Sequence, residues 1–282
     1  MKKEQVLDLM NAVPADLVEE ADVERPAKRR LPGMVRTGLI AACLCLALVG
    51  TAFAAVRYFW VEVFSNEEQT GYRVHGKLIK YPVDRFSAEL LADCETSDNA
   101  NLAAGFHTWE EAKAYLGGGI PLLWPKHVLP DDIHDPPIYL FLGKDHGNGD
   151  KLCAVWVVCR AKYIDRETGR QIEPLIDMYI ATEYNPDGKI DPALEGSVGG
   201  TLYGNQGFSL EQLEDYLMPN GTTAGIVLVE YPQTDDFYPR YECTASFIQG
   251  GILYYVDSGD SHSASRPEDA LADLKTILDL FP

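Results

Sequence analysis

The sequence is short of basic charge and of recognisable catalytic motifs. Its 282 residues include 24 lysines and arginines against 43 aspartates and glutamates, a formal net charge of -19 at pH 7. Because such a chain is repelled by phosphate backbones, we expect no nucleic-acid partner. No GxSxG, SxxK, HExxH, GxGxxG or P-loop pattern is present. We therefore expect a non-enzymatic protein without cofactor, with an exported hydrolase built on a dispersed triad as the enzymatic alternative.

Paired cysteines are also lacking. Two of the six cysteines lie in an apolar run, and the others form no CxxC pair and no zinc-type Cys/His spacing. Cys153 and Cys159 lie six apart in an expected strand, roughly 20 Å from each other, and cannot pair. The pattern favours buried free thiols, and a Cys94–Cys243 bridge is the alternative if the domain is exported.

Two polar segments contain potential metal ligands, but neither has the spacing of a metal site. A turn contains Asp145, His146, Asn148 and Asp150, yet Trp156 stands where a calcium loop needs its bidentate glutamate. The second segment contains His127, Asp131, Asp132, His134 and Asp135. No helical or strand spacing directs these side chains to one centre. We therefore expect a hairpin turn and a loop, without metal.

Only one long apolar run is present. Gly38 to Val56 contains 19 residues without a charge, and as a helix it would span roughly 28 Å, close to the hydrocarbon thickness of a bilayer. Between Arg25 and Arg36 there are five basic residues and no acidic one. The positive-inside bias therefore predicts a single-pass cell-membrane protein with a cytoplasmic N-terminus and an extracytoplasmic C-terminal domain.

The residues of this predicted anchor fall into two sets. The apolar residues expected to contact lipid are Leu39, Ile40, Leu44, Leu46, Leu48, Val49 and Phe53. The positive flank consists of Lys28, Arg29, Arg30 and Arg36. One alternative is a signal peptide cut after Ala54, because Ala52-Phe53-Ala54 fits a cleavage pattern, and another is a helix of a soluble core. The uncharged length and the basic flank favour the retained anchor.

Residues 4–22 predict a short amphipathic helix ahead of the anchor. The candidate partner-binding residues in it are Val6, Leu7, Leu9, Met10, Leu17 and Val18. A helix of this kind is either a plain amphipathic segment near a membrane or a docking element for a cytoplasmic protein.

The rest of the chain predicts an α+β fold with a largely antiparallel sheet and helices packed on it. Expected helices cover 87–94, 108–117, 209–218 and 265–281, with capping boxes Thr108/Glu111, Ser209/Gln212 and Ser265/Glu268 at the last three. Expected strands cover 138–142, 152–161, 172–181, 225–231, 241–248 and 252–256, with an extended piece at 71–83 and a loop at 94–105. The domain prediction is a cytoplasmic segment (1–36), a transmembrane helix (37–56), a juxtamembrane linker (57–105) and an extracytoplasmic α+β domain (106–282).

Several segments carry a family resemblance. They are "EQVLDLMNAVPADLVEEA" at 4–21, "KRR" at 28–30, "GLIAACLCLALVG" from 38, "FHTWEEAKAYLGGGIPLLWP" at 106–125, and the end of the chain from "GGILYYVDSG" to "PEDALADLKTILDLF". Together they resemble single-pass, anti-sigma-factor-like membrane proteins of low-GC Gram-positive, spore-forming bacteria, which carry small uncharacterised extracytoplasmic domains. The resemblance implies a cytoplasmic partner such as a sigma factor and supplies no catalytic residue.

These observations lead to one functional expectation and one alternative. We expect a membrane protein with a regulatory or envelope-sensing role, whose partners are the lipid bilayer, a cytoplasmic protein and an unknown extracytoplasmic ligand. The alternative is a membrane-tethered extracytoplasmic binding module without a cytoplasmic signalling role.

Overall fold

The computed structural model describes residues 59–65, 69–76, 78–96, 101–145, 151–166, 168–185, 202–204, 209–231, 240–259 and 266–282. They belong to one compact unit that runs from Phe53 to Pro282. The predicted N-terminal helix and the predicted span at 37–56 lie outside these residues. None of the helices within the described ranges is long and apolar enough to cross a membrane.

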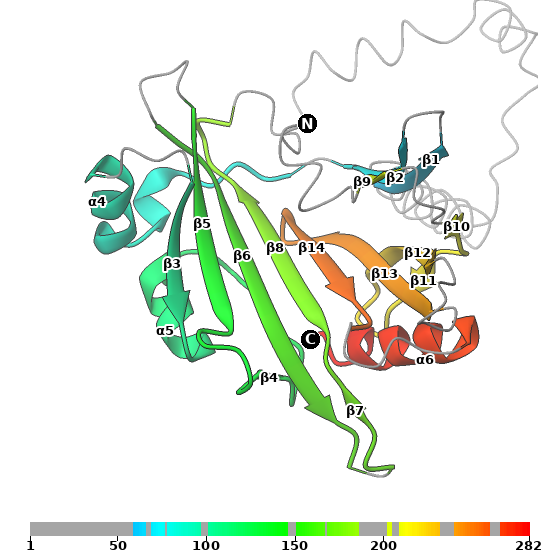
Figure 1. Ribbon diagram of the computed structural model, residues 1–282. Coiled ribbons are helices and arrows are strands. Elements are labelled where there is room, and N and C mark those ends of the chain that lie inside the picture. Colours follow the sequence, from blue (N-terminus) through cyan, green and yellow to red (C-terminus); the bar gives the residue numbers. More distant parts are fainter. Residues whose placement is uncertain are drawn as a thin grey trace, which may run out of the picture. The chain divides into compact units, whose positions relative to one another are not determined.

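A large antiparallel sheet forms the centre of this unit (Figure 1). Its strands follow the order β10-β12-β13-β14-β8-β6-β5-β3. In sequence order they are β3 (Asn101–Phe106), β5 (Ile138–Asp145), β6 (Lys151–Ile164), β8 (Leu175–Ala181), β10 (Ser209–Gln212), β12 (Thr223–Tyr231), β13 (Arg240–Gln249) and β14 (Ile252–Asp257). Each neighbouring pair is antiparallel. The predicted α+β class with a largely antiparallel sheet is therefore confirmed.

Short strands and a second sheet complete the β-structure. Three two-residue strands pair at the margins of the large sheet, β4 (Leu129–Pro130) and β7 (Gln171–Ile172) with β6, and β11 (Tyr216–Leu217) with β12. The second sheet is three-stranded, in the order β1-β2-β9, with β1 (Trp60–Ser65), β2 (Gln69–His75) and β9 (Leu202–Gly204). β1 and β2 form an antiparallel hairpin, which is called the first hairpin below.

Helices cover one face of the large sheet. They are α4 (Ala88–Thr96), α5 (Trp109–Leu116) and α6 (Pro267–Leu278), and a 3-10 turn, η2 (Val83–Arg85), precedes α4. The main core lies on this face, where Leu90 of α4, Leu116 of α5 and Leu274 of α6 are fully buried. β6 is covered on both faces, because Val155 and Val157 join this core and Ala154 joins a smaller one on the other face. The strand expected at 152–161 is therefore a central strand, buried on both faces.

The N-termini of α5 and α6 are determined by residues in or next to the first turn of each helix. Thr108 accepts a hydrogen bond from the Glu111 backbone N–H at 3.2 Å, and the Glu111 carboxylate accepts one from the Thr108 backbone N–H at 3.1 Å. This confirms the predicted capping box. The predicted box at Ser265 and Glu268 is wrong, because the N-cap of α6 is Arg266 and its side chain makes no cap hydrogen bond. Proline at the first helical position starts this helix instead.

The predicted helix at 209–218 is wrong. Ser209–Gln212 and Tyr216–Leu217 are strands that pair with β12, and the Leu213 backbone N–H donates to the Ile226 carbonyl. Pairing with the edge of a large sheet has overridden helix propensity, which is only a weak local preference. The Ser-x-x-Gln pattern is therefore no capping box.

The expected loop at 94–105 is wrong in part, because α4 continues to Thr96 and β3 begins at Asn101. The apolar and small residues of β3 pair with β5 along its whole length and form the edge of the sheet. Residues 57–105, expected as a juxtamembrane linker, contain β1, β2, α4 and most of β3.

Candidate functional site

Three buried acidic side chains gather on the face of the large sheet that the helices leave free. They are Asp177 on β8, Glu242 on β13 and Asp257 on β14, with exposed fractions of 3%, 7% and 9%. β14 lies between β8 and β13, and Asp177 is the cross-strand partner of Tyr255, two positions before Asp257. We call these three residues the carboxyl cluster. Acidic side chains are rarely buried to this extent unless they are paired.

Glu242 and Asp257 form a hydrogen-bonded carboxyl pair. The Tyr231 hydroxyl donates to Oε2 of Glu242 at 2.5 Å, and the Gly259 backbone N–H donates to Oδ1 of Asp257 at 2.6 Å. Burial raises the pKa of Asp257 well above its usual value, and the charge and hydrogen bond of Glu242 raise it further. Burial and the neighbouring Glu242 therefore both favour the protonated form of Asp257.

Asp177 is the least satisfied member of the cluster. Among the described residues, its buried Oδ1 has no hydrogen-bond partner, and the same holds for the buried indole Nε1 of Trp156. Burial raises the pKa of Asp177 well above its usual value, and the nearby Trp156 N–H lowers it in part. That N–H faces the carboxyl without reaching good hydrogen-bond geometry. Burial thus favours the protonated form of Asp177, because a buried carboxylate with so few donors is very costly.

The first hairpin packs on the same face of the sheet. Val61, Tyr72 and Val74 of the hairpin are buried in a core with Tyr255 and other residues of the large sheet. The Tyr72 and Tyr255 rings are stacked, with centroids 6.5 Å apart and planes 9° from parallel. A Cβ added at Gly225 on β12 would lie 2.6 Å from Cγ2 of Val61. The hairpin therefore approaches the sheet closely next to the carboxyl cluster.

The carboxyl cluster can bind and release protons. Buried carboxyls with pKa values raised by desolvation and by each other are typical of functional sites, although structural networks show them too. No group of three or more histidine, cysteine or acidic side chains within the described residues is arranged to hold a metal ion.

The histidine-rich segment 127–135 is held by polar pairs, in which Asp131 is buried and the other members are more exposed. Nδ1 of His134 lies 2.7 Å from Oδ2 of Asp131, and Nη1 of Arg160 lies 3.2 Å from Nε2 of the same histidine. Further pairs join Lys162 to Asp132 at 2.5 Å and His107 to Asp135 at 3.5 Å. These contacts fix the loop against β6.

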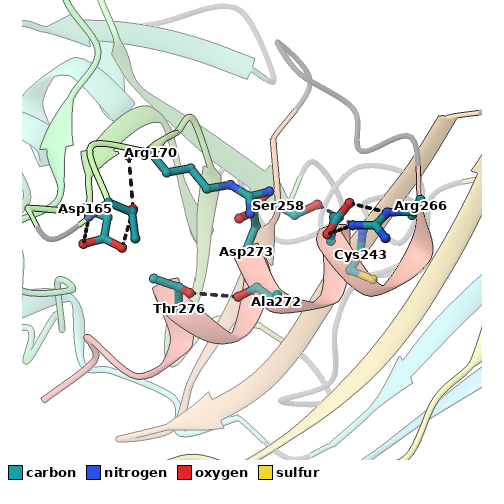
Figure 2. Close-up of polar contacts among 10 residues, drawn as sticks. Asp165, Arg170, Cys243, Ser258, Arg266, Ala272, Asp273 and Thr276 are labelled. Atoms are coloured by element: carbon teal, nitrogen blue, oxygen red, sulfur yellow. Dashed lines mark hydrogen bonds and ion pairs between the residues drawn. The ribbon is translucent and has the colours of Figure 1, made fainter.

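A second polar network joins the β6–β7 hairpin to α6 (Figure 2). Nη2 of Arg170 lies 2.7 Å from Oδ2 of Asp273, across a sequence separation of 103 residues. Burial raises the pKa of Asp273, and the Arg170 charge lowers it in part. Asp273 projects from the helix that covers the opposite face, so it provides a matched control for the carboxyl cluster.

The four cysteines within the described residues, Cys94, Cys153, Cys159 and Cys243, are all free and buried. The free-thiol interpretation is confirmed, and the Cys94–Cys243 bridge is wrong. Burial, with the neighbouring acidic groups, raises the pKa of Cys243 to about 12. Such a thiol stays protonated and unreactive.

The other site residues named from the sequence lie outside the described residues. This holds for the partner-binding set (Val6, Leu7, Leu9, Met10, Leu17, Val18), for the anchor set from Leu39 to Phe53 and for the positive flank from Lys28 to Arg36. It also holds for residues 146–150 of the polar turn. Those assignments stay predictions.

The carboxyl cluster was not among the predicted sites, although each of its members interrupts or borders an apolar strand in the sequence. Asp177 interrupts the apolar run "LIDMYIA", Glu242 precedes "CTASF", and Asp257 follows "ILYYV". One acidic residue in an apolar strand is an exception to the rule that charged residues are exposed. Only the strand order brings the three exceptions to one place.

Comparison with known proteins adds no family or relative. No family model matches the chain, no curated protein matches it, and no solved structure matches it.

Proposed function

We propose that this chain is a single-pass membrane protein with a regulatory, envelope-sensing role. Its exported α+β domain responds to conditions outside the membrane, and its short N-terminal segment contacts a cytoplasmic protein. The basis is the apolar run with its one-sided basic flank, together with the resemblance to anti-sigma-factor-like membrane proteins.

One observation carries the link between domain and membrane. The predicted span ends at Val56 and β1 begins at Trp60, so only three residues separate them. Three residues reach at most about 10 Å when fully extended. A movement of the first hairpin on its sheet would therefore pull directly on the end of the span. A long flexible linker would absorb such a movement.

An alkaline wash of membranes followed by N-terminal sequencing tests the anchor. We expect full-length protein that starts at the N-terminal end of the sequence and stays with the membrane. Soluble protein that starts near Ala55 would show that residues 1–54 are a cleaved signal.

Photo-crosslinking from residue 11 in intact membranes tests the cytoplasmic contact. We expect a discrete cross-linked product that is lost when Val6, Leu7, Leu9 and Met10 are changed together to serine. Changing Lys2, Lys3, Glu4 and Gln5 to serine is the matched control and should leave the product in place. Equal cross-linking, or none, in all three proteins would support the tethered binding module instead.

A further inference from the structure

We propose that the carboxyl cluster is a proton-operated latch on the first hairpin. In its neutral form it holds the hairpin on the large sheet, and loss of a proton as the pH rises loosens that contact. The inference rests on the proposed function, because it names acidity outside the membrane as the condition that the exported domain senses.

A short chain of contacts connects the cluster to the hairpin. Asp177 is the cross-strand partner of Tyr255, and the Tyr255 ring stacks on Tyr72 of β2. Asp257 lies two residues beyond Tyr255 on β14, and the ionised form of Asp177 raises the pKa of Asp257. Asp177 is thus paired with the residue that contacts the hairpin, and Asp257 lies two positions from that residue along β14. A change in the charge of either aspartate therefore alters the surroundings of the hairpin contact.

Two buried polar atoms show where an ionised carboxyl would be most unfavourable. Oδ1 of Asp177 and Nε1 of Trp156 are buried without a hydrogen-bond partner among the described residues. A neutral carboxyl can remain there at moderate cost, whereas a carboxylate needs several donors or water. Ionisation therefore requires an opening through which water can enter.

The first hairpin is the weakest boundary around the cluster. β8, β14 and β13 are held by antiparallel hydrogen-bond ladders on both sides. The hairpin belongs to a separate sheet, and the side chains of Val61 and Tyr72 pack against the large sheet. Lifting the hairpin breaks no strand ladder of the large sheet, so it opens first.

Most of the other titratable groups on this face of the sheet are tyrosines. Among the described residues, the titratable and charged groups on this face include Glu242 and Arg240 of β13, Tyr231 of β12, Tyr255 of β14, Tyr179 of β8, Tyr72 of β2 and Arg160 of β6. Arg160 is hydrogen-bonded to His134. Glu62 and His75, the ionisable pair on β1 and β2, are bonded to each other at 2.8 Å, and both are more exposed than the cluster. We assign the change of charge to Asp177 and Asp257, because both are buried on this face and burial raises the pKa of each.

Hydrogen exchange of the full chain in detergent micelles tests the latch. Amide protection factors, corrected for intrinsic exchange, are measured at pH 5.5 and 8.5. We expect protection in β1 and β2 to fall at least tenfold at pH 8.5, while protection in β5 and α5 changes little. In Asp257→Asn and in Asp177→Asn the fall should be abolished or reduced, and in Asp273→Asn it should persist.

Two further variants separate the latch from general instability. In Gly225→Val the new side chain meets Val61, so the hairpin should be poorly protected at both pH values. Gly118→Val is its control, because a Cβ there meets nothing within 4 Å. The latch is overturned if the wild-type hairpin keeps its protection at pH 8.5, if all elements lose protection equally, or if both Asn variants behave like wild type. Hydrogen exchange needs no cytoplasmic partner. The latch can therefore be contradicted while the membrane and cross-linking results support the proposed function, and the latch can be supported while those results contradict it.

Discussion

Raising the pH from 5 to 7 should lower the free energy of unfolding of the described domain. Burial holds the pKa of Asp177 and of Asp257 well above the usual value in the folded state, whereas both titrate near pH 4 in an unfolded chain. Between those pKa values the folded protein keeps protons that the unfolded chain has released. Each carboxyl then removes about 1.4 kcal/mol of stability for every pH unit.

The sign follows from the raised pKa values. The stabilisation by these carboxyls is complete below about pH 4 and is lost as the pH rises through the folded-state pKa. Urea unfolding of the full chain in micelles, followed by tryptophan fluorescence at several pH values, measures the slope. Repulsion within a chain of charge -19 also weakens the fold at high pH. That contribution is reduced by salt and is nearly unchanged in Asp177→Asn and Asp257→Asn, whose slopes should be smaller than that of wild type. Equal slopes in all three proteins would contradict the account.

Phe247→Ala should destabilise the domain by about 3–5 kcal/mol. Phe247 is fully buried on the helix-covered face, where its ring stacks on Tyr254 and meets the edge of Phe281. Truncation removes the apolar contacts of the ring and leaves a cavity that a β-sheet bordered by α6 cannot close. The shift of the urea midpoint measures the loss.

Leu217→Ala is the control for this substitution, because Leu217 is 67% exposed on β11. A change within about 0.5 kcal/mol is expected there. If Phe247→Ala costs no more than Leu217→Ala, the helix-covered face is not the main source of stability.

The central strands could be predicted from the sequence because their signals are local. β6, β13 and β14 are apolar runs bounded by turn residues, and their observed ends differ from the predicted ones by at most three residues. The Thr108 capping box is likewise complete within four residues. Local signals fail where a contact with a distant segment determines the structure. The sequence of β10 predicts a helix, but its pairing with β12 makes it a strand.

The carboxyl cluster could not be predicted for the same reason. Asp177 and Asp257 come together because β14 pairs with β8, and Glu242 joins them because β13 pairs with β14. Strand order and register between segments so far apart are set by the whole core. A one-residue shift of register would turn each side chain to the helix-covered face.

The most direct test of the account follows the signal from outside to inside. A spin label is placed at residue 11 by Asn11→Cys, with Cys43 and Cys45 changed to serine, in proteoliposomes that present the C-terminal domain outward. The external pH is then raised from 5.5 to 8.5 while the internal pH is held at 7. The account predicts a change in the mobility of the label that is absent when Asp177 and Asp257 are both changed to asparagine. An unchanged spectrum, or the same change in the double variant, would contradict it.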